Sequence, residues 1–256
     1  MNVICFGQQP NGFFPKRFLI AKINTARALQ KESGGKIVFF YHDSDADYRE
    51  TITIMRDIVS GTEARLNFTQ ENKVQKKFSP LYAKRVPAGW KEEILKQLPR
   101  FVSKEMADIF SSVNAKTAAD FCLEMYQKMG LLEGIEVVRS SDVNFRQKAS
   151  DLDKDYFADV QYEGEVVRAQ LLNGKLVLHE GGGKYLDLSM PDKIEKSQKN
   201  AGKDQRFGWM NSVIGATHYV YGEGEKEYLK TLDFPEVKFI DREKIHDSGF
   251  AWLPNS

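Results

Sequence analysis

The sequence predicts an α/β protein built around a parallel β-sheet. Two apolar runs of strand length, at 3–6 and 36–41, enclose a segment of helical period at 16–32. The run "KIVFFY" is continuously apolar, as in a strand buried on both faces of a sheet. Strand, helix and strand in this order are typical of a parallel sheet covered by helices. A strand, a Gly-rich turn, a helix and a last strand at 237–241 repeat the pattern near the end of the chain.

The middle of the chain has a different pattern. Helical segments are predicted at 88–98, at 103–113 with Ser103 as its cap, and at 117–130. Residues 51–58 alternate, as in a strand or an extended loop, and 135–139 return to the sheet.

A β-rich stretch at 156–188 follows, with a hairpin turn at Asn173-Gly174, and then a short polar helix near 191–201. We therefore expect a Rossmann-like core from 1–60 and 131–256, with a β-hairpin elaboration near 156–188. Residues 61–130 form a mainly helical insertion in this prediction.

Composition limits the function classes. The 256 residues are 41% apolar and 29% charged, as in ordinary globular proteins, and the net charge of +1 argues against nucleic acid as the partner. No apolar run could span a membrane, and we expect no secretory signal and no membrane partner. Cys5 and Cys122 provide neither a disulfide framework nor a metal site, which favours a cytoplasmic location. The composition specifies no oligomeric state, and the four histidines form no ligand-spaced pair.

Positive charge gathers in one segment. Residues 73–104 hold nine basic residues against Glu92 and Glu93. Solvated helix faces explain such a surplus, and an electropositive wall over an anionic substrate is the alternative.

The first strand ends in a loop with a candidate anion site. Gly7, Gln8 and Gln9 precede two structure breakers, and Lys16 and Arg17 then open the predicted helix. Cations at a helix start interact unfavourably with its dipole. This cost is small if they are well solvated outside the first turn, and it is offset if an anionic ligand lies there. Both alternatives stay open for this stretch.

The loop after the second strand, "YHDSDADYRE", is acidic. Its aspartates do not fit a calcium loop, because Tyr48 and Ile54 stand where glycine and glutamate are needed. Carboxylates beyond a parallel strand can bind ribose hydroxyls, a substrate amine or magnesium, and the alternative is a turn whose aspartates cap local amides. The candidate residues are His42 and Asp43 for substrate binding and Asp45 and Asp47 for catalysis.

Two glycine-rich turns complete the candidates. In "YVYGEGEKEY", Gly222 and Gly224 permit a tight turn, and Glu225 suits a substrate ammonium or hydroxyl better than phosphate. A turn without a ligand is the alternative there. The second stretch, "HEGGGKY" at 179–185, is a hairpin turn rather than a phosphate loop in this interpretation.

Taken in order, these stretches resemble the family of the cysteine-adding enzyme of bacillithiol biosynthesis. Gly7 to Gly12 is similar to the family's Gly-Gln-Gln loop, and Lys22 to the lysine on the helix that follows. The family's acidic motif matches Asp45-Ala46-Asp47-Tyr48, its glutamine-bearing strand matches Ala169-Gln170, and its final motif matches 219–228. Ala46 replaces a motif histidine, the glycine loop is shifted by one residue, and "QRFGWMN" replaces a longer motif. We expect the family's C-terminal coiled coil to be missing, so this is a short and divergent relative.

The resemblance implies a core like that of class I nucleotidyltransferases and a ligase that joins cysteine to the amine of a glucosamine–malate conjugate. ATP is the co-substrate implied for activating the carboxyl group, and magnesium is left open. Gln8, Gln9 and Lys16 or Arg17 would hold the nucleotide or acyl group, and Asp45 and Asp47 the incoming ammonium or a metal. Glu225 and Tyr228 would fix the second substrate. The alternative function is a non-catalytic or repurposed protein that binds a small ligand or nucleotide on the same fold, which Ala46 favours.

Overall fold

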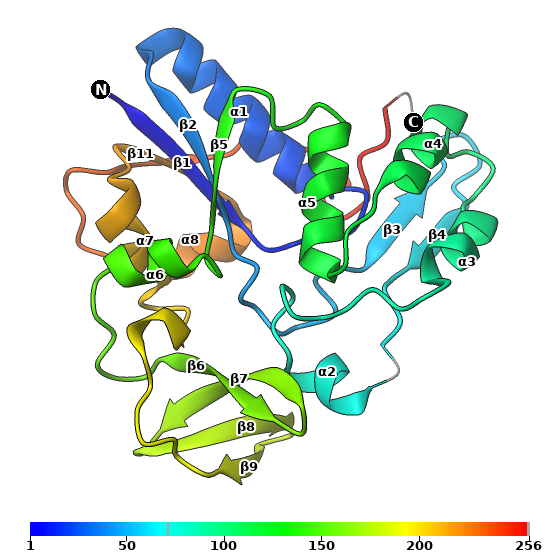
Figure 1. Cartoon of the computed structure of the whole chain (residues 1–256). Helices are drawn as coiled ribbons and strands as arrows, with labels where there is room; N and C mark the ends of the chain where they lie inside the picture. Colours follow the sequence, from blue (N-terminus) through cyan, green and yellow to red (C-terminus); the bar gives the residue numbers. More distant parts are fainter. Residues whose placement is uncertain (71, 255–256) are drawn as a thin grey trace.

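A five-stranded parallel sheet forms the centre of the structure, a computed structural model that describes residues 1–70 and 72–254. The spatial order is β12-β11-β1-β2-β5, and every pair is parallel. The strands are β1 (Val3–Gln8), β2 (Lys36–Tyr41), β5 (Ile135–Arg139), β11 (His218–Tyr221) and β12 (Lys238–Asp241). The chain runs from β1 through β2 to β5 and then returns to the other side of β1 (Figure 1). This α/β arrangement is compatible with the predicted Rossmann-like core.

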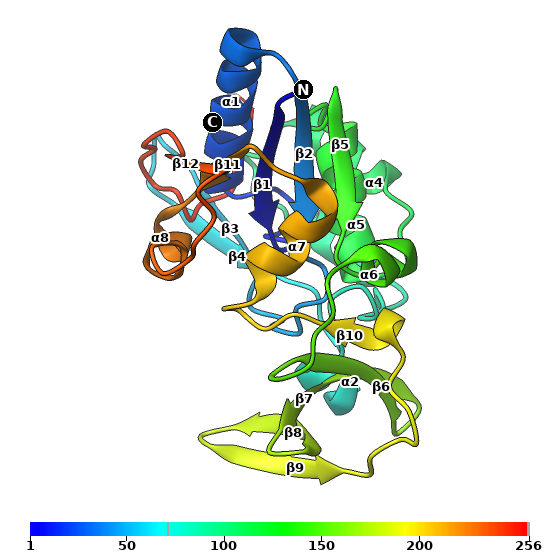
Figure 2. The same ribbon diagram turned by 90° about the vertical axis from the view of Figure 1, so that its left-hand side faces the viewer.

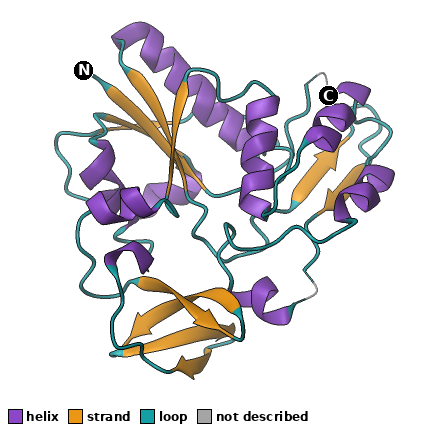
Figure 3. Ribbon diagram, in the orientation of Figure 1, coloured by secondary structure: helices purple, strands orange, loops and turns teal. Residues whose placement is uncertain are grey.

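Both faces of the sheet are covered because its strands are apolar on both sides. Phe6 and Phe39 pack toward α1 (Arg17–Ser33) and α5 (Ala118–Lys128), whereas Cys5, Val38 and Phe40 belong to a second core cluster. That cluster includes residues of α6 (Val143–Lys148), α7 (Arg206–Ile214) and α8 (Glu223–Leu229). The helices therefore lie on both faces of the sheet (Figure 3).

The predicted helical middle contains helices and one small hairpin. Its helices are α2 (Lys73–Phe78), α3 (Trp90–Gln97), α4 (Lys104–Ser112) and α5, and Ser103 caps α4 as predicted. The stretch at 51–58 contains a strand, β3 (Thr53–Arg56), which pairs with β4 (Glu63–Leu66). Aromatic rings join these elements to the first loop, since Phe13 contacts Phe68, Trp90 and Phe110.

The predicted β-hairpin elaboration is larger than a hairpin. It is a five-stranded antiparallel sheet of order β10-β6-β7-β8-β9, which lies below the parallel sheet in Figure 1. Its strands are β6 (Phe157–Tyr162), β7 (Glu165–Leu172), β8 (Lys175–Gly181), β9 (Lys184–Leu188) and β10 (Lys199–Asn200). Asn173 and Gly174, both at positive φ, form the predicted turn between β7 and β8. The helix predicted near 191–201 is wrong, because only a 3₁₀ turn at Lys196–Gln198 and strand β10 form there.

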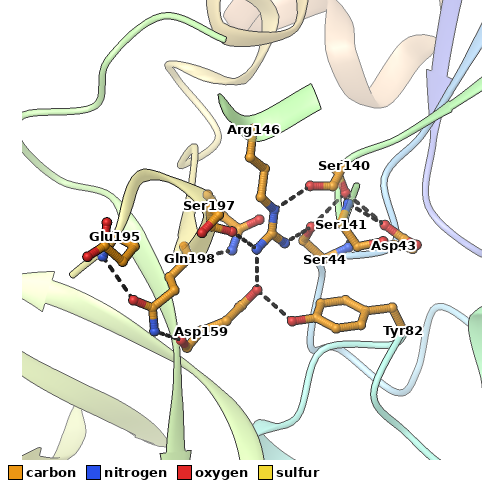
Figure 4. Close-up of polar contacts among 11 residues, drawn as sticks. Asp43, Ser44, Tyr82, Ser140, Ser141, Arg146, Asp159, Glu195, Ser197 and Gln198 are labelled. Carbon is orange, nitrogen blue, oxygen red and sulfur yellow. Dashed lines mark hydrogen bonds and ion pairs between the residues drawn. The ribbon is translucent and has the colours of Figure 1, made fainter. Parts of the chain in front are cut away.

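A buried polar network joins the two sheets. Arg146 on α6 donates to the carbonyl oxygens of Ser140 (2.7 Å) and Ser197 (2.8 Å) and pairs with Asp159 on β6 at 2.7 Å. Its guanidinium also donates to the Ser44 hydroxyl in the loop after β2, and the Tyr82 hydroxyl donates to Asp159 (Figure 4). One side chain thus connects the crevice loop, α6 and the second sheet.

Lys84 carries a buried ammonium whose hydrogen bonds are to carbonyl groups. The residue is 1% exposed, and its Nζ donates to the carbonyl oxygens of Gln75 (2.7 Å) and Lys76 (2.8 Å). Burial lowers the pKa of Lys84 from 10.5 to about 7. The folded protein therefore binds this proton more weakly than the unfolded chain does.

We expect this lysine to make stability rise with pH. Between pH 7 and 9 the unfolded chain keeps the proton that the folded protein releases. Over this range the free energy of unfolding should therefore rise by up to about 2–3 kcal/mol. In Lys84→Met, denaturant titrations should show that this part of the rise in the free energy of unfolding with pH is missing. Lys91→Met is the matched control, because the partly exposed Lys91 ammonium also donates to two carbonyl oxygens, those of Ser111 and Val113. Equal pH slopes for wild type and Lys84→Met would contradict the prediction.

Candidate functional site

A cavity of about 520 Å³ opens at the carboxyl ends of β1, β2 and β11. Its lining comes from the end of β1, the loop after β2, the start of α7 and the turn between β11 and α8. Figure 2 shows β1 pointing toward α7, with β2 and β11 on its two sides. The chain continues from β1 to β2 on one side of β1 and later returns to β11 on the other side, so the strand order reverses at this point. Open α/β sheets bind their ligands at such a point.

Most of the candidate residues line this cavity. The lining includes Gly7, Gln8, Gln9, His42, Asp45, Gly222, Gly224, Glu225 and Tyr228. They come from three loops far apart in the sequence, which the parallel sheet brings together. Lys16, Arg17, Asp43 and Asp47 are not part of the lining.

At the start of α1 the Lys16 ammonium and the first backbone amides have protein partners, whereas the Nε atom of Arg17 is buried and has no partner among the described residues. The Lys16 ammonium donates to the carbonyl oxygen of Glu50 at 3.2 Å and lies over the Phe18 ring. The backbone amides of Arg17 and Phe18 donate to the carbonyl oxygens of Phe250 and Ser248. A later segment of the chain thus occupies the amides that the helix start was expected to offer to an anion.

Asp43 and Asp47 have local partners. Asp43 is fully buried, pairs with Arg139 and accepts hydrogen bonds from Ser140 and Ser141. It therefore connects the loop after β2 to the end of β5. Asp47 pairs with Arg49 at 2.6 Å, and this hydrogen bond holds the pKa of Asp47 below its ordinary value.

Lys22 and Glu225 form an ion pair in the lining of the cavity. The Lys22 ammonium pairs with Glu225 and donates to the carbonyl oxygen of Gly7 at 2.7 Å. Glu225 also accepts from the Tyr219 hydroxyl and the Gly222 amide, both at 2.9 Å. Gly7 has to be small, because a Cβ there would lie 2.8 Å from the Tyr219 hydroxyl oxygen. Glu225 is thus already paired by the protein.

His42 is the most unusual side chain in the cavity. It is 2% exposed and stacks on Phe40 with 6.0 Å between ring centroids. Neither ring nitrogen has a hydrogen-bond partner within the described part of the chain. Burial, followed by the nearby Arg206, lowers the pKa of His42 well below 6.5. The imidazole is therefore neutral at pH 7, and both of its nitrogens are unpaired within the described residues.

Asp45 supplies a carboxylate to the same cavity. Gln9 donates to it at 3.3 Å, and the guanidinium of Arg168 on β7 lies 3.7 Å away. Burial alone would raise its pKa, but the guanidinium groups of Arg168 and Arg206 hold the pKa of Asp45 well below its ordinary value. The cavity thus combines an ionised carboxylate with a neutral imidazole.

Sequence reasoning missed further cations of this cavity. Lys203 before α7, Arg206 at its start and Arg242 after β12 line the cavity. The Nε atom of Arg206 has no partner among the residues the structure describes. Arg206 lies in "QRFGWMN", which the sequence comparison had identified only as a departure from a motif. Arg206 follows an irregular segment, so the sequence did not indicate that a helix begins there and places Arg206 near the sheet.

No protein-family model matches the sequence, and no curated protein matches it either. The resemblance to the cysteine-adding family therefore stays a prediction. Across residues 1–70 and 72–254, no helix has the length and apolar character needed to cross a membrane. In the same residues, no three His, Cys, Asp or Glu side chains are grouped so as to hold a metal ion.

Proposed function

We propose that this protein is a ligase-type enzyme that forms an amide bond between two small molecules in the cavity at the ends of β1, β2 and β11. The observation that carries the proposal is the neutral, unpaired His42 and the ionised Asp45 in one cavity that Lys203 and Arg206 also line. Such a cavity offers a site for an ammonium, a proton acceptor and a site for an anion. A volume of about 520 Å³ lies within the usual range for small-molecule sites.

Each group has a part in amide formation. The Asp45 carboxylate binds the substrate ammonium, and the neutral imidazole of His42 takes one of its protons. The freed nitrogen lone pair then attacks an activated carbonyl carbon and forms the C–N bond. The bond from that carbon to the leaving group breaks, the leaving group keeps the electron pair, and the second ammonium proton passes to the leaving group or to water. Lys203 and Arg206 stabilise the negative charge on that leaving group.

A nucleoside triphosphate such as ATP would supply the activation of the carboxyl group. The residues present fit its phosphates at Lys203 and Arg206. They do not fit them at the turn before α8, where Glu223 and Glu225 add negative charge. Following the resemblance, the substrates are cysteine and the amine of a glucosamine–malate conjugate. The core would then be of the class I nucleotidyltransferase type.

Product formation tests the proposal. The protein is incubated with ATP, Mg²⁺, cysteine and glucosamine–malate, and mass spectrometry measures the condensed product. We expect wild type to form it and Asp45→Asn to form it at least about 100 times more slowly, since the ammonium loses its ionic partner. Asp187→Asn, on the exposed edge strand β9, is the matched control. Ligand binding without product in wild type would favour the non-catalytic alternative.

Thermal unfolding with ATP tests the anion site separately. At about 100 times its dissociation constant, a ligand that binds only the folded state stabilises it by about 2.7 kcal/mol, or roughly 5–10 °C in this size range. We expect Lys203→Gln/Arg206→Gln to lose most of this shift. Lys16→Gln/Arg17→Gln is the matched pair and should keep it. The reverse result would restore the start of α1 as the anion site.

A further inference from the structure

A second cavity of about 360 Å³ borders the acidic loop after β2. It is lined by residues 46–49 of that loop, by Lys77 and Phe78 of α2, and by Phe157, Arg168 and His179 of the second sheet. The function proposed above does not use this cavity. Asp45 and Arg168 connect the two cavities, because Asp45 lines the first, Arg168 lines the second, and the pair lies 3.7 Å apart.

Arg168 is buried without enough partners. Its side chain is 7% exposed, and its guanidinium lies 3.8 Å above the Phe157 ring. Its one hydrogen bond within the described residues is a long one, 3.5 Å from Nη2 to the carbonyl oxygen of Ala201. The Nε atom is buried and has no partner there. A guanidinium has five donors, and a buried one that is so weakly paired is suited to bind an anion.

The other charged groups around this cavity favour an anion as well. Lys77 is 43% exposed, and its pairing with Glu180 is loose, at 3.5 Å. Asp47 adds little net negative charge because Arg49 pairs with it at 2.6 Å. His179 lies on the exposed side of β8 and adds ring nitrogens at the rim. The lining is thus positive around one buried guanidinium.

We propose that the second cavity binds the carboxylate or phosphate group of a second substrate, with Arg168 as its main partner. In treating this anion as a co-substrate, the inference rests on the proposed function. Arg168 reaches Asp45, so a molecule anchored in the second cavity lies next to the ammonium site of the first. The two cavities would then hold the two reactants beside the same acidic loop.

Isothermal titration with inorganic phosphate and with malonate tests this inference. The titrations are made in a Lys203→Gln/Arg206→Gln background, which removes the α7 cations of the first cavity. We expect binding to persist there and to weaken at least tenfold on adding Arg168→Gln. Adding Lys77→Gln/His179→Gln instead should weaken it about three- to tenfold. These two residues lie at the surface, so their replacement tests the site even if Arg168→Gln fails to fold.

The outcomes distinguish the sources of the anion and the two proposals. Tighter binding of phosphate than of malonate identifies a phosphorylated substrate, and the reverse identifies a carboxylic acid. Binding of neither probe in this background, or equal binding after Lys77→Gln/His179→Gln, would overturn the inference. Binding that persists in a protein that forms no amide product would retain the anion site while rejecting the ligase reaction.

Discussion

Replacing Arg146 by methionine should lower the free energy of unfolding by about 3–5 kcal/mol. Arg146 and Asp159 are both buried, with side-chain exposures of 3% and 6%. Removing one member of a buried ion pair leaves the other charge uncompensated, and losses of this size follow. Here the carbonyl oxygens of Ser140 and Ser197 also lose a donor. For a chain of this length the melting temperature should fall by roughly 6–20 °C, which calorimetry measures.

Two further variants show whether the buried charge is the cause. Arg146→Met/Asp159→Asn should recover part of the loss, because it removes the uncompensated carboxylate. Arg56→Met removes a guanidinium that also makes two hydrogen bonds to one carboxylate, that of Glu63, but at the surface. It should cost about 1 kcal/mol or less. If Arg146→Met melted like Arg56→Met, the network would not be what joins the two sheets.

The core strands were predictable because their sequence pattern is local. A parallel strand buried on both faces must be apolar throughout, and "KIVFFY" became β2 with five of its six residues buried. Ser103 was likewise predictable as a cap, since it needs only the amide of Met106, three residues further on. The second sheet was underestimated because β10 is two residues long and pairs with a strand distant in sequence.

The candidate site was predictable only where it follows a strand. The loops after β1, β2 and β11 meet because parallel strands end at one edge, so Gln9, Asp45 and Gly222 came together. The cations depend on long-range contacts instead. Carbonyl groups of Ser248 and Phe250 occupy the amides at the start of α1, whereas Arg168 and Arg206 arrive from other elements. No local sequence pattern indicates these long-range contacts.

The largest effect on activity is expected at His42. If its neutral imidazole accepts the proton of the attacking amine, His42→Gln should lower kcat/KM by about 10²–10⁴-fold. Burial and Arg206 lower the pKa of His42 well below 6.5, so this base is already unprotonated at pH 6. Wild-type kcat/KM should therefore show no loss from His42 protonation between pH 8 and pH 6. A fall of activity centred near pH 6.5 would contradict a base whose pKa is lowered by burial.

Stability provides a readout of His42 that needs no substrate. Below about pH 6.5 the unfolded chain binds a proton at this histidine, whereas the folded protein does not, because its pKa is lowered. The free energy of unfolding should therefore fall by up to about 1.4 kcal/mol for each pH unit below 6.5. His42→Gln should lose this component, whereas His246→Gln, which changes an exposed residue that is not part of the cavity lining, should keep the wild-type slope. A wild-type slope in His42→Gln would mean that the pKa of His42 is the same in the folded protein and in the unfolded chain, which would contradict a base that stays unprotonated at pH 6.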